Sequence, residues 1–404
     1  MKGKILFIER SLWITIERLP LRLSQAGFQI SFLCQPESIV NHLPAADKIH
    51  WTEVDFLSQV ESAVESFAPD LLICLDEATI HAFAAASASP EFAAFAARHG
   101  PLLQRSFGNL KTLKPRCQRR FLCAPVVQER IRLPRTITSR DPAVLLRFAE
   151  DCDWRIAAKR EGSFGGQGVK KIFSEAEFRQ ALPEIVAVPE GCILQQWIEG
   201  EITMGASIAR DGKLLSSFSM RRLEGIPLGY STVVKPISSP GMDETAAALA
   251  DILQLSGFFS CDFIVDKVSG IPYLLELNPR TVTLFHLDCL FGLDTAQAVQ
   301  DLIDGQDHFQ AAKLVDRPLE VALFPKALVH RPESVSARAG FLHDVPWDSP
   351  EILAAYRRLY PKKIIRWAAA DSILPRWLAR LFPKAIARRS PQLIDRWIQS
   401  RRQR

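Results

Sequence analysis

Residues 257–281 read GFFSCDFIVDKVSGIPYLLELNPRT and carry the most specific pattern in the chain. They predict two apolar strands joined by a Ser-Gly turn, with Asp262 on the first strand and Glu276 and Asn278 on the second. Because side chains alternate along a strand, Glu276, Asn278 and Arg280 share one face. An acid on an apolar strand is costly without a partner, and hard oxygen ligands suit an ion that bridges phosphates. We therefore expect a Mg²⁺ site here, with Mn²⁺ as the alternative ion.

Two stretches upstream carry groups that suit a nucleotide. Residues 155–172, RIAAKREGSFGGQGVKKI, predict a hairpin in which one strand ends at Lys159 and a glycine-rich loop follows. Glycines let backbone amides approach phosphate oxygens and lysine adds a positive charge, although a plain flexible turn has the same composition. Residues 191–201, GCILQQWIEGE, predict a strand and linker that can line an adenine, although a tryptophan such as Trp197 more often lies in a core.

The first hundred residues predict a parallel α/β domain. Apolar runs at 4–8, 29–34 and 70–75 alternate with helical patterns, as in βαβ units. Asp76 and Glu77 follow the third run, at the strand end where open α/β sheets bind ligands. They are expected to contact substrate, and two exposed loop acids are the alternative. No Gly-x-Gly-x-x-Gly turn follows the first run, which argues against a dinucleotide.

In this order the three stretches resemble the ATP-grasp superfamily, in the branch of carboxylate–amine ligases similar to carbamoyl-phosphate synthase, biotin carboxylase and D-alanine–D-alanine ligase. The resemblance covers roughly residues 105–310 and is strongest in LLELNPR. It implies an ATP-grasp fold of mixed α/β and α+β class, preceded by the Rossmann-like domain. It also implies an enzyme that uses ATP and Mg²⁺ to join a small carboxylate to an amine through an acyl-phosphate.

The resemblance assigns a role to each matching residue. Those implied to hold the ATP phosphates are Lys159, Ser163, Phe164, Gly165 and Gly166. Those implied to contact the adenine and ribose are Gln195, Gln196, Trp197, Ile198 and Glu201. The implied metal ligands are Asp262, Glu276 and Asn278. Arg280 is implied to steady the transferred phosphoryl group and, with Lys159, to take part in catalysis.

The sequence departs from the family pattern at a second phosphate-binding lysine. RCQRRF at 116–121 lacks the usual Asp-Lys pair, and Arg119 is the nearest equivalent, although arginine binds phosphate by a planar fork rather than as a point charge. Residues 220–234, MRRLEGIPLGYSTVV, are similar to a region that borders the acceptor site. There Arg221 or Arg222 is expected to bind a substrate carboxylate, and an exposed charged strand end is the alternative.

The chain is expected to have three parts. These are a Rossmann-like domain at 1–105, an ATP-grasp domain at 106–310 and a helical basic extension at 311–404. Within the second part we expect a small lid lobe at about 120–194 and a large lobe at 195–310. Basic amphipathic helices at 361–404 can pack on the body, lie on an anionic membrane surface or dock on an acidic carrier protein. Nucleic acid is not expected, because no recognised binding module accompanies the charge, and a homodimer is left open.

The composition excludes several classes of protein. The 404 residues are 48% apolar and 24% charged with a net charge of +5, which argues against long disorder, collagen-like sequence or a disulfide scaffold. The first apolar run is too short for a signal peptide, and no run of about 18 apolar residues predicts a membrane span. We expect a cytoplasmic protein, with peripheral attachment to the inner membrane face as the alternative.

Two other functions fit the same motifs. One is an ATP-grasp enzyme that phosphorylates an enol or other oxygen before an amine adds, similar to the ligase that joins glycine to a cyclohexenone in mycosporine synthesis. The other is a nucleotide-binding regulatory or membrane-associated protein without turnover. The full set of Lys159, Asp262, Glu276, Asn278 and Arg280 argues against the second, because a binder does not need all of them.

Overall fold

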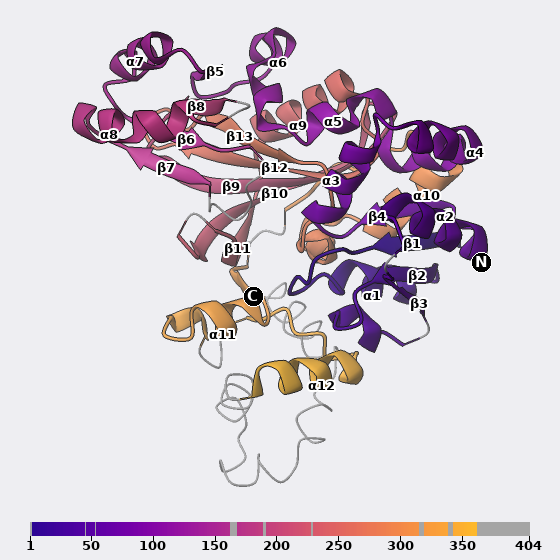
Figure 1. Ribbon diagram of the computed structural model, residues 1–404. Coiled ribbons are helices and arrows are strands. Elements are labelled where there is room, and N and C mark those ends of the chain that lie inside the picture. The colour runs from indigo at the N-terminus through magenta and orange to yellow at the C-terminus, as the bar shows by residue number, and fades with distance from the viewer. Residues whose placement is uncertain are drawn as a thin grey trace.

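The computed structural model places three sheets along the chain (Figure 1). It describes residues 2–361 except 45, 53, 162–167, 189–190, 228, 315–318 and 338–341. The first sheet is parallel and the other two are antiparallel. This confirms the expected mixture of α/β and α+β parts.

The N-terminal sheet has the order β3-β2-β1-β4 and consists of β1 Lys4–Ile8, β2 Gln29–Cys34, β3 Asp47–His50 and β4 Leu71–Cys74. The three expected strands are confirmed, whereas β3, with the polar sequence DKIH, gave no apolar signal. Alternate residues of β1 face opposite layers, so one face packs against α1 Arg18–Gln25. The other face packs against α2 Phe56–Phe67, α3 Glu77–Ala86 and α4 Pro90–Phe107. The carboxyl ends of β1 and β4 therefore lie side by side and carry Glu9 and Asp76.

The central sheet has the order β13-β12-β9-β10-β11-β14. Its strands are β9 Gly200–Arg210, β10 Lys213–Gly225, β11 Ser231–Ile237, β12 Gly257–Asp266, β13 Pro272–Asn278 and β14 Val321–Ala322. One face is covered by α9 Pro240–Leu253. The opposite face packs on η4 Phe285–Phe291 and α10 Thr295–Asp304. The hairpin expected at 257–281 is confirmed as β12 and β13.

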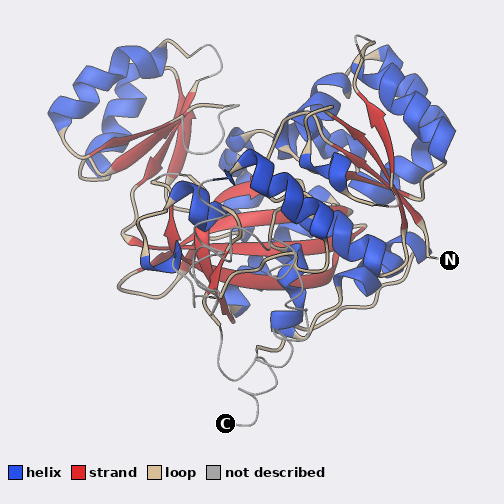
Figure 2. Cartoon of the chain, turned by 90° about the horizontal axis from the view of Figure 1, so that it is seen from below, coloured by secondary structure: helices blue, strands red, loops and turns tan. Residues whose placement is uncertain are grey.

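A smaller sheet forms a lobe with its own core, and Figure 2 shows it standing apart from the central sheet. Its order is β5-β8-β6-β7, with β5 Thr136–Ser139, β6 Ile156–Lys159, β7 Val169–Ile172 and β8 Cys192–Gln196. Two helices pack on it, α7 Pro142–Asp151 and α8 Glu175–Val186. Short helices precede it: η2 Leu110–Thr112, α5 Leu113–Arg116, η3 Arg119–Cys123 and α6 Pro125–Arg130.

The C-terminal part contributes a strand to the central sheet as well as helices. β14 pairs with β11 and so completes the central sheet, and α11 Lys326–His330, η5 Val335–Ala337 and α12 Pro350–Leu359 follow. On α12, the Tyr356 hydroxyl donates to Glu17 Oε2 at 2.9 Å, which ties this part to the N-terminal domain. The expected boundary at 310 therefore separates β14 from the sheet that it completes, and the three-part division stays a prediction.

The basic run on which the membrane and carrier-protein expectations rest lies mostly at 362–404, outside the described residues. In the part of the chain that is described, none of the helices combines the length and apolar character needed to cross a bilayer.

Candidate active site

A cavity of about 520 Å³ opens between the small sheet, the central sheet and the ends of the N-terminal strands. Its volume is within the range of small-molecule sites. It is lined by most of the residues singled out in the sequence, namely Asp76, Glu77, Arg119, Lys159, Gln195, Gln196, Trp197, Ile198, Arg222, Asp262, Glu276, Asn278 and Arg280. Segments that are 200 residues apart in the chain thus meet in one cavity.

The acidic wall of the cavity is built by the β12–β13 hairpin. Asp262 lies directly opposite Glu276 in the register, and Ser260 lies opposite Asn278, so the polar side chains share one face. Asn278 Nδ2 donates to Asp262 Oδ2 at 3.3 Å. Burial raises the pKa of Asp262 to about 7, and the Glu276 carboxylate adds to that shift. Two carboxylates and an amide held this closely are a donor set that fits Mg²⁺, because a divalent cation offsets their repulsion.

Three cationic side chains face this wall. Arg119 Nη2 lies 3.0 Å from Glu276 Oε1, and Arg119 Nη1 donates to the Arg160 carbonyl at 2.6 Å. Lys159 Nζ donates to Gln195 Oε1 at 2.6 Å. Burial lowers the pKa of Lys159 to about 8, although the charge of Glu276 partly offsets this. Arg280 is the third cation, and its guanidinium lies 3.3 Å from Glu77 Oε2.

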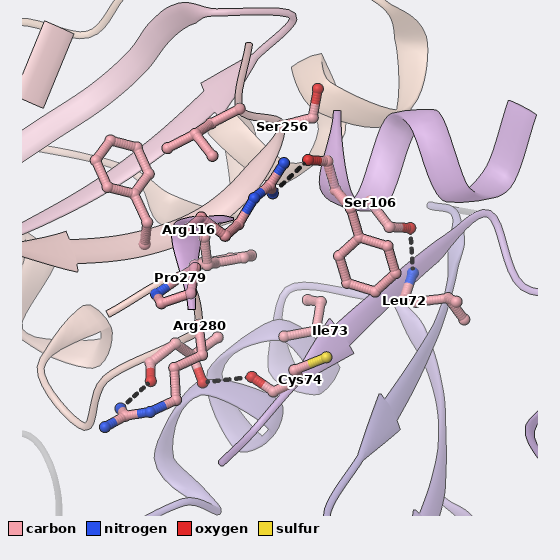
Figure 3. A pocket seen from close by; sticks show the side chains of 13 residues that line it. Leu72, Ile73, Cys74, Ser106, Arg116, Ser256, Pro279 and Arg280 are labelled. Carbon is pink, nitrogen blue, oxygen red and sulfur yellow. Dashed lines mark hydrogen bonds between the residues drawn. The ribbon is translucent and has the colours of Figure 1, made fainter. Parts of the chain in front are cut away.

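Arg280 is positioned by the contact between the N-terminal domain and the end of β13, shown in Figure 3. The neighbouring Thr281 hydroxyl donates to the Cys74 carbonyl at 3.1 Å, and Arg116 Nη1 donates to the Phe107 carbonyl at 2.7 Å. A gap of only about 20 Å³ remains in this contact, enough for about one water molecule. Arg280 is therefore held by two domains at once.

Comparison with solved structures identifies this architecture. The N5-carboxyaminoimidazole synthetase of Staphylococcus aureus, solved with ADP, aligns over 79% of this chain and 81% of its own, with a TM-score of 0.59 and 13% identity. A biotin carboxylase of Campylobacter jejuni, solved with an ATP analogue, covers 78% and 74%, with a TM-score of 0.56 and 13% identity. An L-amino acid ligase of Bacillus licheniformis covers 74% of each chain, with a TM-score of 0.53 and 15% identity. The chain has the ATP-grasp fold.

Comparison by sequence alone finds much weaker similarity to known proteins. No protein-family model matches the chain. A curated relative, the C-terminal section of the carbamoyl phosphate synthase large chain of Aquifex aeolicus strain VF5, is 22% identical over 166 residues. That match covers 38% of this chain and 30% of the relative, so the chain corresponds to less than a third of that protein. The ATP-grasp fold expected from the motifs is nevertheless confirmed by the structural likeness.

Two expected ATP-grasp site residues lie off the cavity. Arg221 Nη1 and Glu201 Oε2 form an ion pair at 3.0 Å, and neither residue is among the described residues that line the cavity. The adjacent Arg222 does line it, and its guanidinium donates to the carbonyls of Gly229 and Ile226. Glu199, to which no motif assigned a role, lines the cavity in place of Glu201 and accepts from Trp197 Nε1 at 2.8 Å.

Ser163, Phe164, Gly165 and Gly166 lie outside the described residues, so their phosphate-binding role stays a prediction. The hairpin that carries the loop is confirmed, with Lys159 opposite Val169. The side chain of Gln195 also has a structural role that the motif did not reveal. It accepts from Lys159 Nζ, and its Nε2 donates to the Thr136 hydroxyl at 3.1 Å.

Asp76 is a structural cap although it borders the cavity. Its carboxylate accepts from Thr79 N at 2.9 Å at the start of α3, from the Thr79 hydroxyl at 3.0 Å, from Arg10 N at 2.7 Å and from the Ser11 hydroxyl at 3.1 Å. Both oxygens are thus engaged, which argues against the substrate contact expected of Asp76. Glu77 keeps its place in the site through Arg280.

We expect Asp76→Ala to lower the free energy of unfolding by about 3 kcal/mol, because it removes a helix cap and leaves several buried donors unpaired. Urea denaturation measures this change. Asp55→Ala is the matched control, since Asp55 caps α2 through Ser58 N in a more exposed place and its loss should cost much less. Equal losses in the two variants would contradict the role given to Asp76.

Glu9 lies behind the cavity and is fully buried. Neither of its carboxylate oxygens has a hydrogen-bonded partner among the described residues, although Ser38 and the backbone of Gln35 and Trp13 lie close by. Burial raises the pKa of Glu9 to about 7, and the Asp76 carboxylate raises it further. The folded protein therefore holds a neutral Glu9 more readily than the unfolded chain does.

This shift predicts a pH dependence of stability. A pKa raised on folding favours the folded state below pH 4.5, and the advantage is lost as the pH rises through about 7. Between pH 4.5 and pH 8 we expect the free energy of unfolding of the wild type to fall by about 3 kcal/mol relative to that of Glu9→Gln. Chemical denaturation at both pH values measures it. Glu37→Gln, at an exposed site, is the control for the loss of a glutamate, and an equal pH response in all three proteins would refute the assignment.

Proposed function

We propose that the protein is an ATP-dependent ligase that joins a carboxylate to an amine through an acyl-phosphate, with Mg²⁺ bound by Asp262, Glu276 and Asn278. The observation that carries the proposal is the pairing of Asp262 with Glu276 across β12 and β13, in a cavity that also holds Arg119, Lys159 and Arg280. The solved structures of the same fold include an L-amino acid ligase and proteins bound to ADP or an ATP analogue, which supports this reading.

The arrangement suits phosphoryl transfer because that reaction asks mainly for alignment and charge neutralisation. Lys159 and Arg119 would contact the ATP phosphates, and Gln195 would hold the Lys159 ammonium in place. Arg280 would stabilise the charge on the phosphoryl group as it reaches the carboxylate. The bound Mg²⁺ would neutralise charge on the phosphate oxygens. No protein nucleophile is needed, because the carboxylate oxygen attacks and the amine later displaces phosphate.

The adenine end would be formed by β8 and the linker after it. Gln196, Trp197, Ile198 and Glu199 line this side of the cavity. Trp197 is fixed by its hydrogen bond to Glu199 and by an edge-to-face contact with Phe173, with ring centroids 5.3 Å apart. The Lys171 ammonium lies 4.7 Å from the Trp197 ring centroid, which adds positive charge near the nucleotide.

The test is to trap the intermediate. Purified protein is incubated with Mg-ATP, a panel of carboxylic acids and hydroxylamine, and ADP, phosphate and hydroxamate are measured. An acyl-phosphate gives hydroxamate and ADP in equal amounts, and Glu276→Gln should give neither. ADP and phosphate without hydroxamate for every acid would indicate that water rather than a carboxylate accepts the phosphoryl group, and would overturn the proposal. Absence of ATP turnover with every acid would overturn it as well.

A further inference from the structure

Part of the cavity lining has no role in the nucleotide and metal contacts proposed above. It includes six residues from distant parts of the chain, namely Trp13, Met204, Tyr230, Leu284, Leu323 and Lys326. Five of the six side chains are apolar or aromatic, and Lys326 is the only charged one among them. Such walls favour a ligand with a substantial apolar group.

Helix α11 fixes both the lysine and one of the rings. Lys326 and His330 are four residues apart and so lie on the same side of the helix. Lys326 Nζ lies 5.3 Å from the Tyr230 ring centroid, and the Tyr230 hydroxyl is 2.7 Å from His330 Nε2. Tyr230 is thereby held at its ring and at its hydroxyl, which gives the wall a defined shape.

Arg280 reaches the same wall from the other side. Its guanidinium lies 6.0 Å from the Trp13 ring centroid, and the Trp13 and Tyr230 rings meet edge to face with centroids 6.4 Å apart. Arg280 Nε is buried and has no hydrogen-bond partner among the described residues. A buried guanidinium N–H without an acceptor is costly, and a bound anion would remove that cost. Two cations and two aromatic rings thus form one continuous group, which we call the acceptor wall: Trp13, Tyr230, Arg280 and Lys326.

Lys326 is not needed as the counter-ion of the buried acids behind it. Asp344 already accepts from His286 Nε2 at 2.7 Å and from Phe324 N. Glu17 is paired with Arg18 at 2.9 Å and accepts from the Tyr356 hydroxyl. The ammonium of Lys326, only 4% exposed, donates instead to the neutral hydroxyl of Thr283 at 2.8 Å. Its charge is therefore available to an anion in the cavity.

We infer that the acceptor wall binds the acid substrate, with the carboxylate between Lys326 and Arg280 and an aromatic or branched apolar group against Trp13 and Tyr230. This inference rests on the proposed function and names its substrate class: a monocarboxylic acid with a large apolar side group. Lys326 lies four residues past the end of β14, so its position depends on the strand that completes the central sheet.

Binding of matched probes tests the inference independently of turnover. With a non-hydrolysable Mg-ATP analogue present, we expect 3-phenylpropionate to bind at least about tenfold more tightly than propionate, which lacks the ring, and than 3-phenylpropanol, which lacks the charge. Isothermal titration calorimetry measures all three. Equal binding of the alcohol and the acid would overturn the role of the two cations, and equal binding of propionate would overturn that of the rings.

Variants then assign the effect to Lys326. Lys326→Met should weaken 3-phenylpropionate about tenfold or more, Lys326→Arg should retain most of the affinity, and neither should alter affinity for the ATP analogue. Lys213→Met, at an exposed ion pair with Asp307, is the control for loss of a lysine. Because Lys326 is buried, the thermal unfolding midpoint of each variant is measured first, and Tyr230→Ala supplies a second variant that should weaken the aromatic acid but not propionate.

The two proposals fail in different ways. Tight, Lys326-dependent binding of 3-phenylpropionate without hydroxamate from any acid would overturn the ligase and leave the acceptor wall standing. Hydroxamate formation that Glu276→Gln abolishes and Lys326→Met leaves unchanged in KM would overturn the acceptor wall and leave the ligase standing.

Discussion

Glu276→Gln is expected to lower ATP-dependent turnover by about a thousandfold, the largest effect of any single substitution in this protein. The glutamine carbonyl can still accept from Arg119, so the local packing survives. What is lost is one of the two facing charges that would hold Mg²⁺, and an amide is a much weaker ligand for that ion. The same loss leaves Arg119 and Lys159 without the carboxylate that partly balances them.

Steady-state ADP release at several Mg²⁺ concentrations measures the effect. Raising the Mg²⁺ concentration should restore part of the turnover if the loss lies in metal binding. Glu320→Gln is the control, because Glu320 is half-exposed and lies 3.8 Å from Lys235 on the surface. Turnover within a few fold of wild type in Glu276→Gln would show that this glutamate is no metal ligand.

Lys159→Met is expected to lower kcat/KM for ATP by about a hundredfold or more. Lys159 is partly buried beside the acidic wall, and loss of solvent around its ammonium lowers its pKa to about 8, so it remains mainly protonated at neutral pH. An ammonium in such a place interacts strongly with phosphate, because little solvent screens the charge. Methionine keeps the length of the side chain and removes the charge together with the hydrogen bond to Gln195.

Three companion variants locate the effect. Lys170→Met changes a lysine on the paired strand β7 whose ammonium is exposed and lies 3.2 Å from Glu184, and it should change nothing. Lys159→Arg should recover only part of the activity, because the fork of arginine does not fit the single acceptor on Gln195. Gln195→Ala should cost about tenfold by releasing the ammonium. If Lys170→Met and Lys159→Met proved equally active, Lys159 would have no part in binding ATP.

The sequence was most informative where function and local structure coincide. Strand alternation placed Glu276 and Asn278 on one face and the hairpin brought Asp262 beside them, and the structure pairs Asp262 with Glu276 across β12 and β13. Lys159 and residues 195–198 were likewise singled out from short stretches of sequence, and they line the cavity. The capping role of Asp76 could not be read from the sequence, because a cap and a ligand use the same carboxylate and only the folded protein shows the four donors around it.

The remaining features depend on contacts between distant segments. β14 has two residues, too few for any strand pattern, yet it sets the position of Lys326. Trp13 and Tyr230 are 217 residues apart in the chain and meet only in the folded protein. Glu199 and Glu201 cannot be ranked from sequence, because the linker after β8 breaks the alternation that would tell which of them faces the cavity.

Because β14 lies near the C-terminal end of the chain, it is synthesised after the rest of the central sheet. A nascent chain that has reached residue 281 already contains every expected metal and phosphate ligand, but β11 then forms an open edge of the central sheet. Unpaired strand edges recruit other chains, so a translation product released at that point is prone to aggregate. Residues 321 and 322 cover part of this edge, and the Tyr356 hydroxyl then donates to Glu17 near the start of the chain. Premature termination is therefore expected to favour aggregation over a soluble nucleotide-binding fragment.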